Sequence, residues 1–294
     1  MKSRGAALLL VLWLVALLTA VVGSFALAAR TEHLQGQVLA RGTEARALAR
    51  AGLEYAIWRV TREDRRLRWM ADGREYRWDP GTLSPGGEVA IRIGDEQGKV
   101  DLNMADAELL AALFQATGSP RAEAAAVAAA ILDWRDVDEL TQPAGGAEDR
   151  DYAAAGRHYG AADSPFGSVA ELEQVLGMTP DLYARVAPAL TVYSGRPVPD
   201  PAFAPEAVLA ALGYDADAVR ARREAWSPDG GAPPPQLTPG QPLVADNSGT
   251  YSIESRARVR GRTAVLRVVV RSGGNGLPGS AWTPLRWEEG ASPR

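Results

Sequence analysis

The sequence predicts an α+β protein in which a long N-terminal helix packs on a small antiparallel sheet and an all-α domain is inserted into that sheet. Three observations lead to this prediction. An uncharged apolar run is followed directly by a segment whose apolar residues have helical spacing. Two regions far apart in the chain alternate apolar and polar residues as strands do. Between them, residues 103–190 have almost only helix and loop patterns, which indicates an insertion.

The first element is an apolar run from Gly5 to Ala29 that contains no charged side chain. A helix of this length would reach roughly 37 Å, which is enough to span the hydrocarbon core of a bilayer with some tilt. Lys2 and Arg4 precede the run. By the positive-inside rule they place the N-terminus in the cytoplasm and the residues after Arg30 on the other side of the membrane.

Three interpretations of this run compete. A cleaved secretory signal has a shorter apolar region, about 7–15 residues, although a small-x-small site occurs at 26–28. A plain membrane anchor accounts for the length alone. The third accounts for more residues, because basic residues, then Gly5, then Ala6 opening an apolar helix resemble the type III signal of prepilins. In that family a membrane peptidase cuts after the glycine and the new N-terminus is methylated, which implies cleavage between Gly5 and Ala6.

The second element, residues 30–62, continues the helix in amphipathic form. Its apolar side chains recur mostly at steps of three and four, so one continuous helix is predicted from about residue 6 to about residue 62. Gly36, Gly42 and Gly52 weaken this prediction, since each costs about 1 kcal/mol inside a helix. An apolar half followed by an amphipathic half that docks on a globular head resembles the architecture of pilins.

Leu10 occupies an unusual position if Ala6 is the mature N-terminus. In pilin-like subunits the fifth mature residue is normally a glutamate, which is thought to pair with the free amine of a neighbouring subunit. A lone carboxylate in lipid is costly and needs such a partner. Leu10 cannot make that pair. A subunit without the acid needs no neighbour above it, which suits the first, topmost subunit of a fibre.

The sheet is predicted from three segments. Residues 74–79 (REYRWD) and 88–93 (EVAIRI) have strand composition. Residues 251–272 predict a hairpin that turns near Gly261. The G-x-G-x-x-G spacing at 274–279 contains a proline and no helix follows it, so this segment is predicted to be a flexible tail and not a nucleotide-binding loop.

The inserted domain has a characteristic order of short motifs. Asn103 stands where a helix N-cap belongs in GKVDLNMADAELLAAL, and ILDWRDVDE, GAEDRDY, FGSVAELEQVLGM and ALTVYSG follow. A second, weaker copy of the opening starts at Pro201 (PAFAPEAVLAALG) and lacks the usual capping residues. From Gly5 to about Leu212 the chain closely resembles the K-type minor pseudopilins of type II secretion (general secretion pathway protein K), which characteristically lack the acid that Leu10 replaces.

This resemblance implies a division of the chain and a structural function. The expected parts are a leader (1–5), a transmembrane half-helix (6–29), an amphipathic half-helix (30–62), the first part of a pilin-like head (63–102), an inserted α-domain of the helix-hairpin-helix or SAM-like kind with its return (103–212), and the second part of the head with the C-terminal hairpin (213–294). The implied function is to start and cap the pseudopilus, with the I- and J-type minor pseudopilins and above the major pseudopilin, for protein export across the outer membrane. Prepilin peptidase would process the chain. A single span would hold it in the bacterial inner membrane, with its head in the periplasm.

An alternative function comes from the same domain, because its helix pairs also resemble helix-hairpin-helix units of membrane-anchored competence proteins that bind DNA. The turns TGSPRA and LGMTPD both lack the second glycine of that motif. From Asp101 to Leu190 there are nine Asp and six Glu against five Arg, so the domain carries 5 − 15 = −10. Phosphate binding needs the opposite sign, so no nucleic-acid partner is expected.

Several acidic residues crowd the segment 133–151 around a QPAGG loop. Asp136, Asp138, Glu148 and Asp151 could converge on a cation if this loop folds back, and calcium takes about 6–8 oxygen ligands. The spacing is not that of an EF-hand, and a solvated acidic loop is an equal alternative from spacing alone. Calcium binding by this module in the resembled family favours a structural Ca²⁺ site. Asp133, beside Trp134, is expected to serve the fold.

Nothing in the sequence indicates catalysis. The chain has no cysteine, which excludes disulfides and thiolate metal sites, and only two histidines, His33 and His158. His158 has no nucleophile motif near it and is predicted to be a loop residue. The protein is therefore predicted not to be an enzyme.

Overall fold

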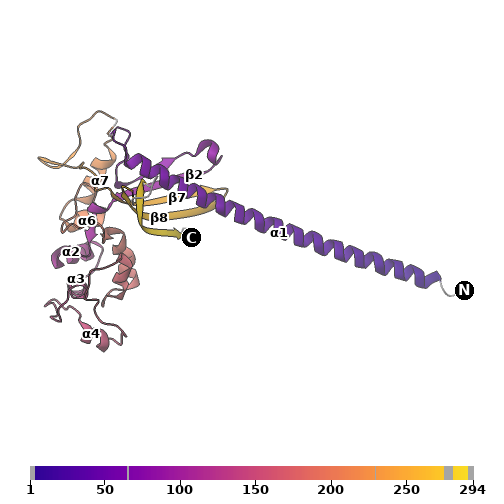
Figure 1. The fold of residues 1–294 in the computed structure, drawn as a ribbon, viewed down its shortest axis with the longest axis horizontal. Coiled ribbons are helices and arrows are strands. Elements are labelled where there is room, and N and C mark those ends of the chain that lie inside the picture. Colours follow the sequence, from indigo (N-terminus) through magenta and orange to yellow (C-terminus); the bar gives the residue numbers. More distant parts are fainter. Residues whose placement is uncertain (1–3, 65, 229, 275–280, 291–294) are drawn as a thin grey trace.

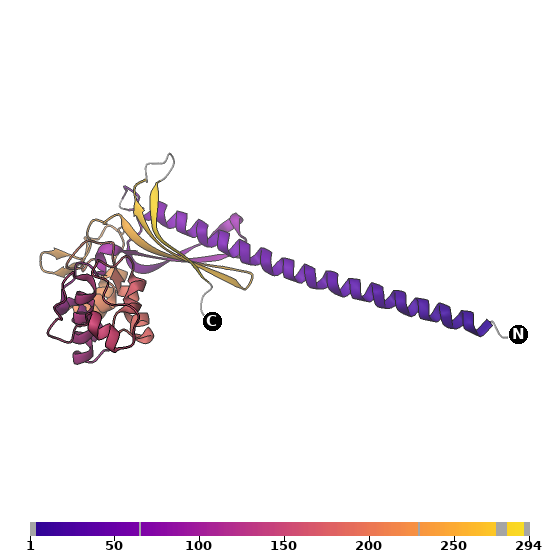
Figure 2. The same cartoon turned by 60° about the horizontal axis from the view of Figure 1, so that its bottom comes forward.

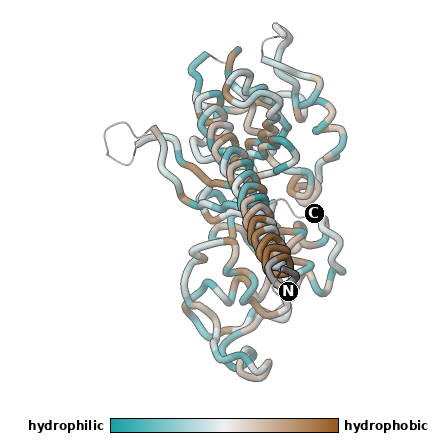
Figure 3. The backbone as a smooth tube through the Cα atoms, turned by 90° about the vertical axis from the view of Figure 1, so that its right-hand side faces the viewer, coloured by the Kyte–Doolittle hydropathy of each residue, from teal (hydrophilic) through white to brown (hydrophobic). Residues whose placement is uncertain are grey.

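The fold is seen in a computed structural model that describes residues 4–64, 66–228, 230–274 and 281–290. Helix α1 (Arg4–Val60) is continuous and projects from the head as a rod (Figures 1 and 2). This confirms the single long helix. Among the described residues, α1 is the one helix apolar enough to cross a membrane, and its apolar window is wholly exposed. Figure 3 shows the apolar colour concentrated toward the N-terminal end of this helix.

The head contains a five-stranded antiparallel sheet on which the C-terminal part of α1 packs. Its strands are β1 (Asp72–Trp78), β2 (Glu88–Asp95), β7 (Thr250–Val259), β8 (Arg262–Ser272) and β9 (Trp282–Gly290), paired in that order. One apolar core lies between α1 and the sheet. Strand β9, which pairs with β8 at the edge of the sheet, was not predicted from the sequence. Gly276 and Gly279 of the G-x-G-x-x-G spacing lie outside the described residues.

The β7–β8 hairpin turns where the sequence predicted. Val259 pairs with Arg262, so the loop consists of Arg260 and Gly261, whose φ angles are 46° and 79°. Two successive positive φ angles match the twist of the flanking strands, which is why glycine is favoured in such turns. On β8 the face directed at α1 is apolar and comprises Ala264, Leu266, Val268 and Val270.

Gly52 explains how α1 approaches the sheet closely. A Cβ atom at this position would lie 2.4 Å from Ser255 Oγ and 2.7 Å from Val89 Cγ1. Side chains on β2 and β7 therefore occupy the space that any larger residue would need. Gly36 and Gly42 have nothing within 4 Å of such an atom, so packing does not require them.

The inserted module is larger than predicted. Its helices are α2 (Ala107–Ala116), α3 (Arg121–Arg135), α4 (Asp149–Ala154), α5 (Pro180–Val186), α6 (Glu206–Ala211) and α7 (Ala216–Glu224). It also contains the short strands β3 (Val100–Asp101), β4 (Leu190–Thr191), β5 (Gln236–Thr238) and β6 (Gln241–Pro242). Its 3₁₀ turns are Glu96–Gly98, Val169–Gln174 and Ala187–Ala189. Outside the module, a further 3₁₀ turn, Gly81–Leu83, joins β1 to β2. A second apolar core unites these helices and includes Leu237 and Leu243. The main sheet resumes only at Thr250, so the boundary expected at 212/213 lies instead near residue 249.

The structure contradicts the cap predicted for α2 and agrees with the weak capping predicted for α6. Helix α2 starts at Ala107 and its N-cap is Asp106, whose Oδ1 accepts from Leu109 N at 2.8 Å. The prediction of Asn103 as the cap is therefore wrong. Asn103 instead exchanges two hydrogen bonds with the Phe166 backbone, at 2.7 and 3.0 Å. Helix α6 has Pro205 at its N-cap and no side-chain capping bond, as its sequence predicted.

Buried carboxylates hold the entry and exit of the module together. Asp95 Oδ2 accepts from Ser248 N at 2.8 Å, and Asp101 Oδ2 accepts from Gly195 N at 2.8 Å and from Ser194 Oγ at 3.1 Å. Both aspartates are 1% exposed. Charge-assisted bonds of this kind are stronger than neutral ones when water is excluded. Asp95 and Ser248 thus join the segments that leave and re-enter the sheet, whereas Asp101 ties residues 194–195 to β3 inside the module.

Candidate functional site

The acidic residues of the inserted module form a cluster where α3 ends and α4 begins. Asp133 lies in the last turn of α3, Asp136 is the residue after the helix, and Glu148 immediately precedes α4. The intervening loop folds back on itself. One carboxylate oxygen from each of the three residues lies within 4.8 Å of the other two. Asp133 and Glu148 are 0% and 2% exposed, and Asp136 is partly exposed.

The local fold that brings these residues together depends on Asp133 and a glycine. Both carboxylate oxygens of Asp133 lie within reach of Gln142 N, at 3.2 and 3.3 Å, which holds the loop against α3. A Cβ atom at Gly146 would lie 1.9 Å from Asp133 Oδ2, so only glycine allows the loop to pass this close. Behind the cluster the Trp134 ring packs on Tyr152, with ring centroids 5.6 Å apart.

The electrostatics of the cluster favour a bound cation. Burial, followed by the charges of Asp133 and Asp136, raises the pKa of Glu148 to about 7. Burial is also the largest cause that raises the pKa of Asp133 and of Asp136. Glu148 Oε1 and Asp136 Oδ1 are buried and accept no hydrogen bond from any described residue. Buried acceptors without donors are costly, and a hard cation with oxygen ligands satisfies them.

The four residues predicted as metal ligands do not all meet. Asp136 and Glu148 come together, with Asp133 as the third member of the group. Asp138 Oδ1 instead accepts from Leu140 N at 2.9 Å, and Asp151 Oδ2 accepts from Glu148 N at 3.0 Å. Sequence reasoning missed Asp133, because Asp136 already lies beyond α3 in an extended conformation and only the closure of the loop brings the two carboxylates together.

The N-terminal positions singled out in the sequence lie at the exposed end of α1. The backbone of Gly5 and Ala6 is helical. The Ala6 side chain and the whole of Lys2 lie outside the described part of the chain. Leu10 lies in the apolar segment and is 70% exposed. Its side chain therefore faces whatever surrounds the helix, lipid or another subunit.

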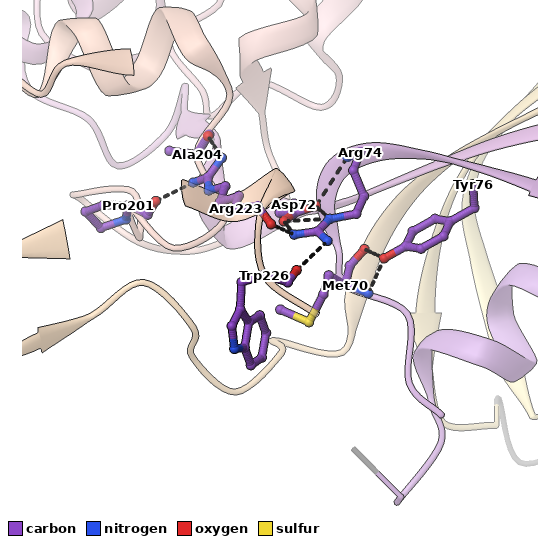
Figure 4. Close-up of polar contacts among 8 residues, drawn as sticks. All are labelled: Met70, Asp72, Arg74, Tyr76, Pro201, Ala204, Arg223 and Trp226. Carbon is purple, nitrogen blue, oxygen red and sulfur yellow. Dashed lines mark hydrogen bonds and ion pairs between the residues drawn. The ribbon is translucent and has the colours of Figure 1, made fainter. Parts of the chain in front are cut away.

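Two arginines fasten the module to the edge of the sheet (Figure 4). Arg74 on β1 donates to the carbonyl oxygens of Arg223 at 2.6 Å and Trp226 at 3.1 Å, at the end of α7. Arg223 in turn donates to the carbonyls of Ala204 at 2.8 Å and Pro201 at 2.5 Å, before α6. Nothing in the sequence indicated this pair, because its acceptors are backbone atoms distant in the chain.

Comparison with known proteins identifies the domain that carries the acidic cluster. Residues 91–195 match the family model described as Type II secretion system (T2SS), protein K. The match covers 105 of the 294 residues. It begins on β2 and ends just after β4, so the matched residues contain the cluster and both ends of its loop.

Similarity to two known proteins extends beyond residues 91–195. The chain is 29% identical over 211 residues to the type II secretion system protein K of Pectobacterium carotovorum subsp. carotovorum, and equally to that of Klebsiella pneumoniae. Each alignment covers 64% of this chain and 62% of the relative. Nothing among these relatives supports the DNA-binding alternative.

A solved structure shares the fold. It is a chain from the crystal structure of the GspK-GspI-GspJ complex of the enterotoxigenic Escherichia coli type 2 secretion system, with a TM-score of 0.54 and 19% identity. The match covers 90% of this chain and 99% of that chain. The architecture of a long helix on an antiparallel sheet with an inserted helical module is thus pilin-like, as the sequence predicted.

Proposed function

We propose that the protein is a minor pseudopilin at the tip of a type II secretion pseudopilus, where it starts and caps the fibre. The observation that carries the proposal is the insertion of a protein K domain into a pilin-like sheet whose long helix has an apolar anchor. Its partners would be the I- and J-type minor pseudopilins and the major pseudopilin. The anchor would span the bacterial inner membrane, with the head in the periplasm, and the role would be structural rather than catalytic.

Leu10 supports a place at the tip. A subunit within the fibre needs a carboxylate at this depth to neutralise the amine of its neighbour, and an uncompensated carboxylate there would be unfavourable. Leu10 is apolar and exposed on α1, so it matches lipid or the apolar side of another helix. The large inserted module, which extends from one end of the sheet beside α1, would obstruct a further subunit above (Figure 2).

The experiment that tests this function is co-purification of the full chain with its I- and J-type partners, combined with secretion in a strain that lacks the chain. A ternary complex and restored secretion are expected. Mass spectrometry of the purified chain should show a methylated Ala6 at the N-terminus, and Gly5→Val should block processing by prepilin peptidase. An N-terminus near Ala29, or full secretion by Gly5→Val, would contradict the proposal.

We also propose that the acidic cluster holds a calcium ion. Asp133, Asp136 and Glu148 would supply carboxylate ligands, with water and loop carbonyls completing the shell. Asp138 and Asp151 remain proposed ligands in the segments that flank the group. The ion would neutralise the mutual repulsion of the three carboxylates, which otherwise opposes closure of the loop. This role is structural, and the fit rests on the two buried oxygens that have no donor.

Thermal unfolding of the full chain in detergent tests the calcium site. Calcium at 100 times its Kd should stabilise the folded state by about 2.7 kcal/mol, which corresponds to roughly 5–10 °C in Tm. Magnesium should do so poorly, because it requires stricter octahedral geometry. Glu148→Gln should abolish most of the response, whereas the matched change Glu173→Gln, at an exposed position, should leave it intact. Identical curves with calcium and with chelator would refute the site.

A further inference from the structure

A cluster of aromatic and arginine side chains lies where α1 ends against edge strand β1. Tyr55 is at its centre: its ring stacks on Trp58 at 5.6 Å and on Trp78 at 5.0 Å, and meets Trp69 edge-on at 5.3 Å. Trp69 stacks on Tyr76 at 4.2 Å. The chain has only 20 aromatic residues (8 Trp, 8 Tyr and 4 Phe), so a quarter of them gather here.

Part of this cluster is exposed and faces away from the sheet. Trp58 is 47% exposed, although Ala56, Ile57 and Val60 beside it on α1 are buried. It therefore lies on the back of the helix, opposite the face that packs on the strands. Leu67, in the segment that returns from α1, is 46% exposed. Large apolar side chains that are exposed in one region of a protein often mark an interaction surface.

Two arginines of the cluster stack on its tryptophan rings. The Arg62 guanidinium lies 3.9 Å from the centre of the Trp58 ring, and that of Arg59 lies 5.0 Å from the Trp69 ring. Within the described ranges neither side chain makes an ion pair or a hydrogen bond, and the Nε atom of each is buried without an acceptor. Stacking on an aromatic ring orients a guanidinium group and leaves its N–H groups free for a bidentate contact with a carboxylate.

The charge around these arginines is positive. From residue 59 to residue 69 the sequence contains five arginines against Glu63 and Asp64. Tryptophan, tyrosine and arginine are also the residues that dominate binding energy at the centres of protein interfaces. The composition thus fits a protein partner that presents a carboxylate next to an apolar side chain.

We propose that this aromatic–arginine surface (Tyr55, Trp58, Arg59, Arg62, Leu67 and Trp69) docks a neighbouring minor pseudopilin. The proposal rests on the proposed function and names the surface through which the chain would hold its partner. Trp58 is on α1, the element that continues from the head into the apolar anchor (Figure 1). A subunit of the same architecture anchored in the same membrane would bring its head alongside this helix. The guanidinium groups of Arg59 and Arg62, which pair with no acid among the described residues, would then bind acidic residues on that head.

The test compares two exposed tryptophan–arginine pairs, one where α1 ends near edge strand β1 and the other between α1 and edge strand β9. Trp58→Ala and Arg62→Glu alter the proposed surface. The matched control is Trp287→Ala on β9, since Trp287 is 37% exposed and carries the Arg50 guanidinium at 5.6 Å from its ring. Each full-length variant is titrated with the I- and J-type partners in detergent, and its Tm is recorded to establish folding.

At least a tenfold loss of affinity for one partner is expected for Trp58→Ala and for Arg62→Glu, with Trp287→Ala unchanged. For Arg62→Glu, an acid-to-arginine change on the partner should restore binding if the missing contact is a carboxylate. Wild-type affinity in both surface variants would overturn the inference while the proposed function stands. If the wild-type chain binds neither partner, the proposed function itself fails, and this outcome is distinct because the control fails with it.

Discussion

Gly52 allows the most direct test of how α1 is seated on the sheet. Replacing it with alanine adds one methyl group at a point where the structure leaves no room, 2.4 Å from Ser255 Oγ and 2.7 Å from Val89 Cγ1. Taken alone, glycine to alanine inside a helix stabilises by about 1 kcal/mol. Overpacking a tight core costs about 1–3 kcal/mol. The balance predicts that Gly52→Ala lowers the free energy of unfolding by up to about 2 kcal/mol.

The same substitution elsewhere in the helix should act in the opposite direction. Gly36→Ala and Gly42→Ala meet no atom within 4 Å, so they gain helix propensity without a clash and should not lower stability. Urea unfolding of the full chain in detergent, followed by tryptophan fluorescence, measures all three variants. Because Ser255 Oγ is buried and has no hydrogen-bond partner among the described residues, Ser255→Ala should be tolerated and should recover part of the loss in Gly52→Ala.

The result that would refute this reasoning is specific. If Gly52→Ala is as stable as Gly42→Ala, the close approach of α1 to β2 and β7 does not limit packing. If Ser255→Ala leaves the loss in Gly52→Ala undiminished, the clash arises from another atom, and Val89→Ala becomes the variant that should relieve it.

Three further perturbations follow from the site and the anchor. Leu10→Glu should lower the amount of protein in the membrane and not improve secretion, since an unpaired acid in the apolar segment is unfavourable by at most about 2.5–3.5 kcal/mol, the cost at the bilayer centre; greater incorporation along the fibre, measured by immunoblotting of sheared pseudopili, would contradict a tip position. With calcium chelated, the urea midpoint should fall as pH rises from about 4.5 to about 7, because the folded state keeps a proton on Glu148, whose pKa is about 7, that the unfolded chain has released; Glu148→Gln should flatten this slope, and an opposite slope would show that the cluster is not the cause. Arg74→Ala should destabilise by about 3–5 kcal/mol, because it leaves the Asp72 carboxylate, 3% exposed, without its ion pair at 2.7 Å; hydrogen exchange that stays slow at the end of α7 would show that Arg74 does not fasten the module.

Local patterns in the sequence were sufficient for the elements whose partners are nearby. The spacing of apolar residues predicted α1 because one face of the helix repeats every three or four residues. The turn at Arg260 and Gly261 could be predicted because a two-residue hairpin loop demands positive φ, which depends only on local sterics. These features need no knowledge of the rest of the chain.

Features that depend on distant contacts could not be obtained in this way. Strand β9 follows a glycine-rich segment and includes Pro284, so its own composition argues against a strand, and only pairing with β8 makes it one. Leu237 and Leu243 join the core of the inserted module from a proline-rich stretch without periodicity. For the acidic cluster, the residue types and the loop could be predicted from the sequence, but which carboxylates converge depends on how that loop closes over Gly146.

The division of the head into two apolar cores bears on how a tip subunit could work. One core joins α1 to the sheet, and the other lies wholly within the inserted module, which also contains the acidic cluster. The two cores meet where Ala202 and Phe203, in the module segment before α6, pack into the α1 core, and they are also connected by the Asp95–Ser248 hydrogen bond and the Arg74–Arg223 pair at the sheet edge. A change in the acidic loop would have to be relayed through the core of the module and these contacts to reach α1. Because Tyr55 and Trp69 of the aromatic–arginine surface pack on the α1 core, docking of a partner there should be largely independent of whether calcium is bound.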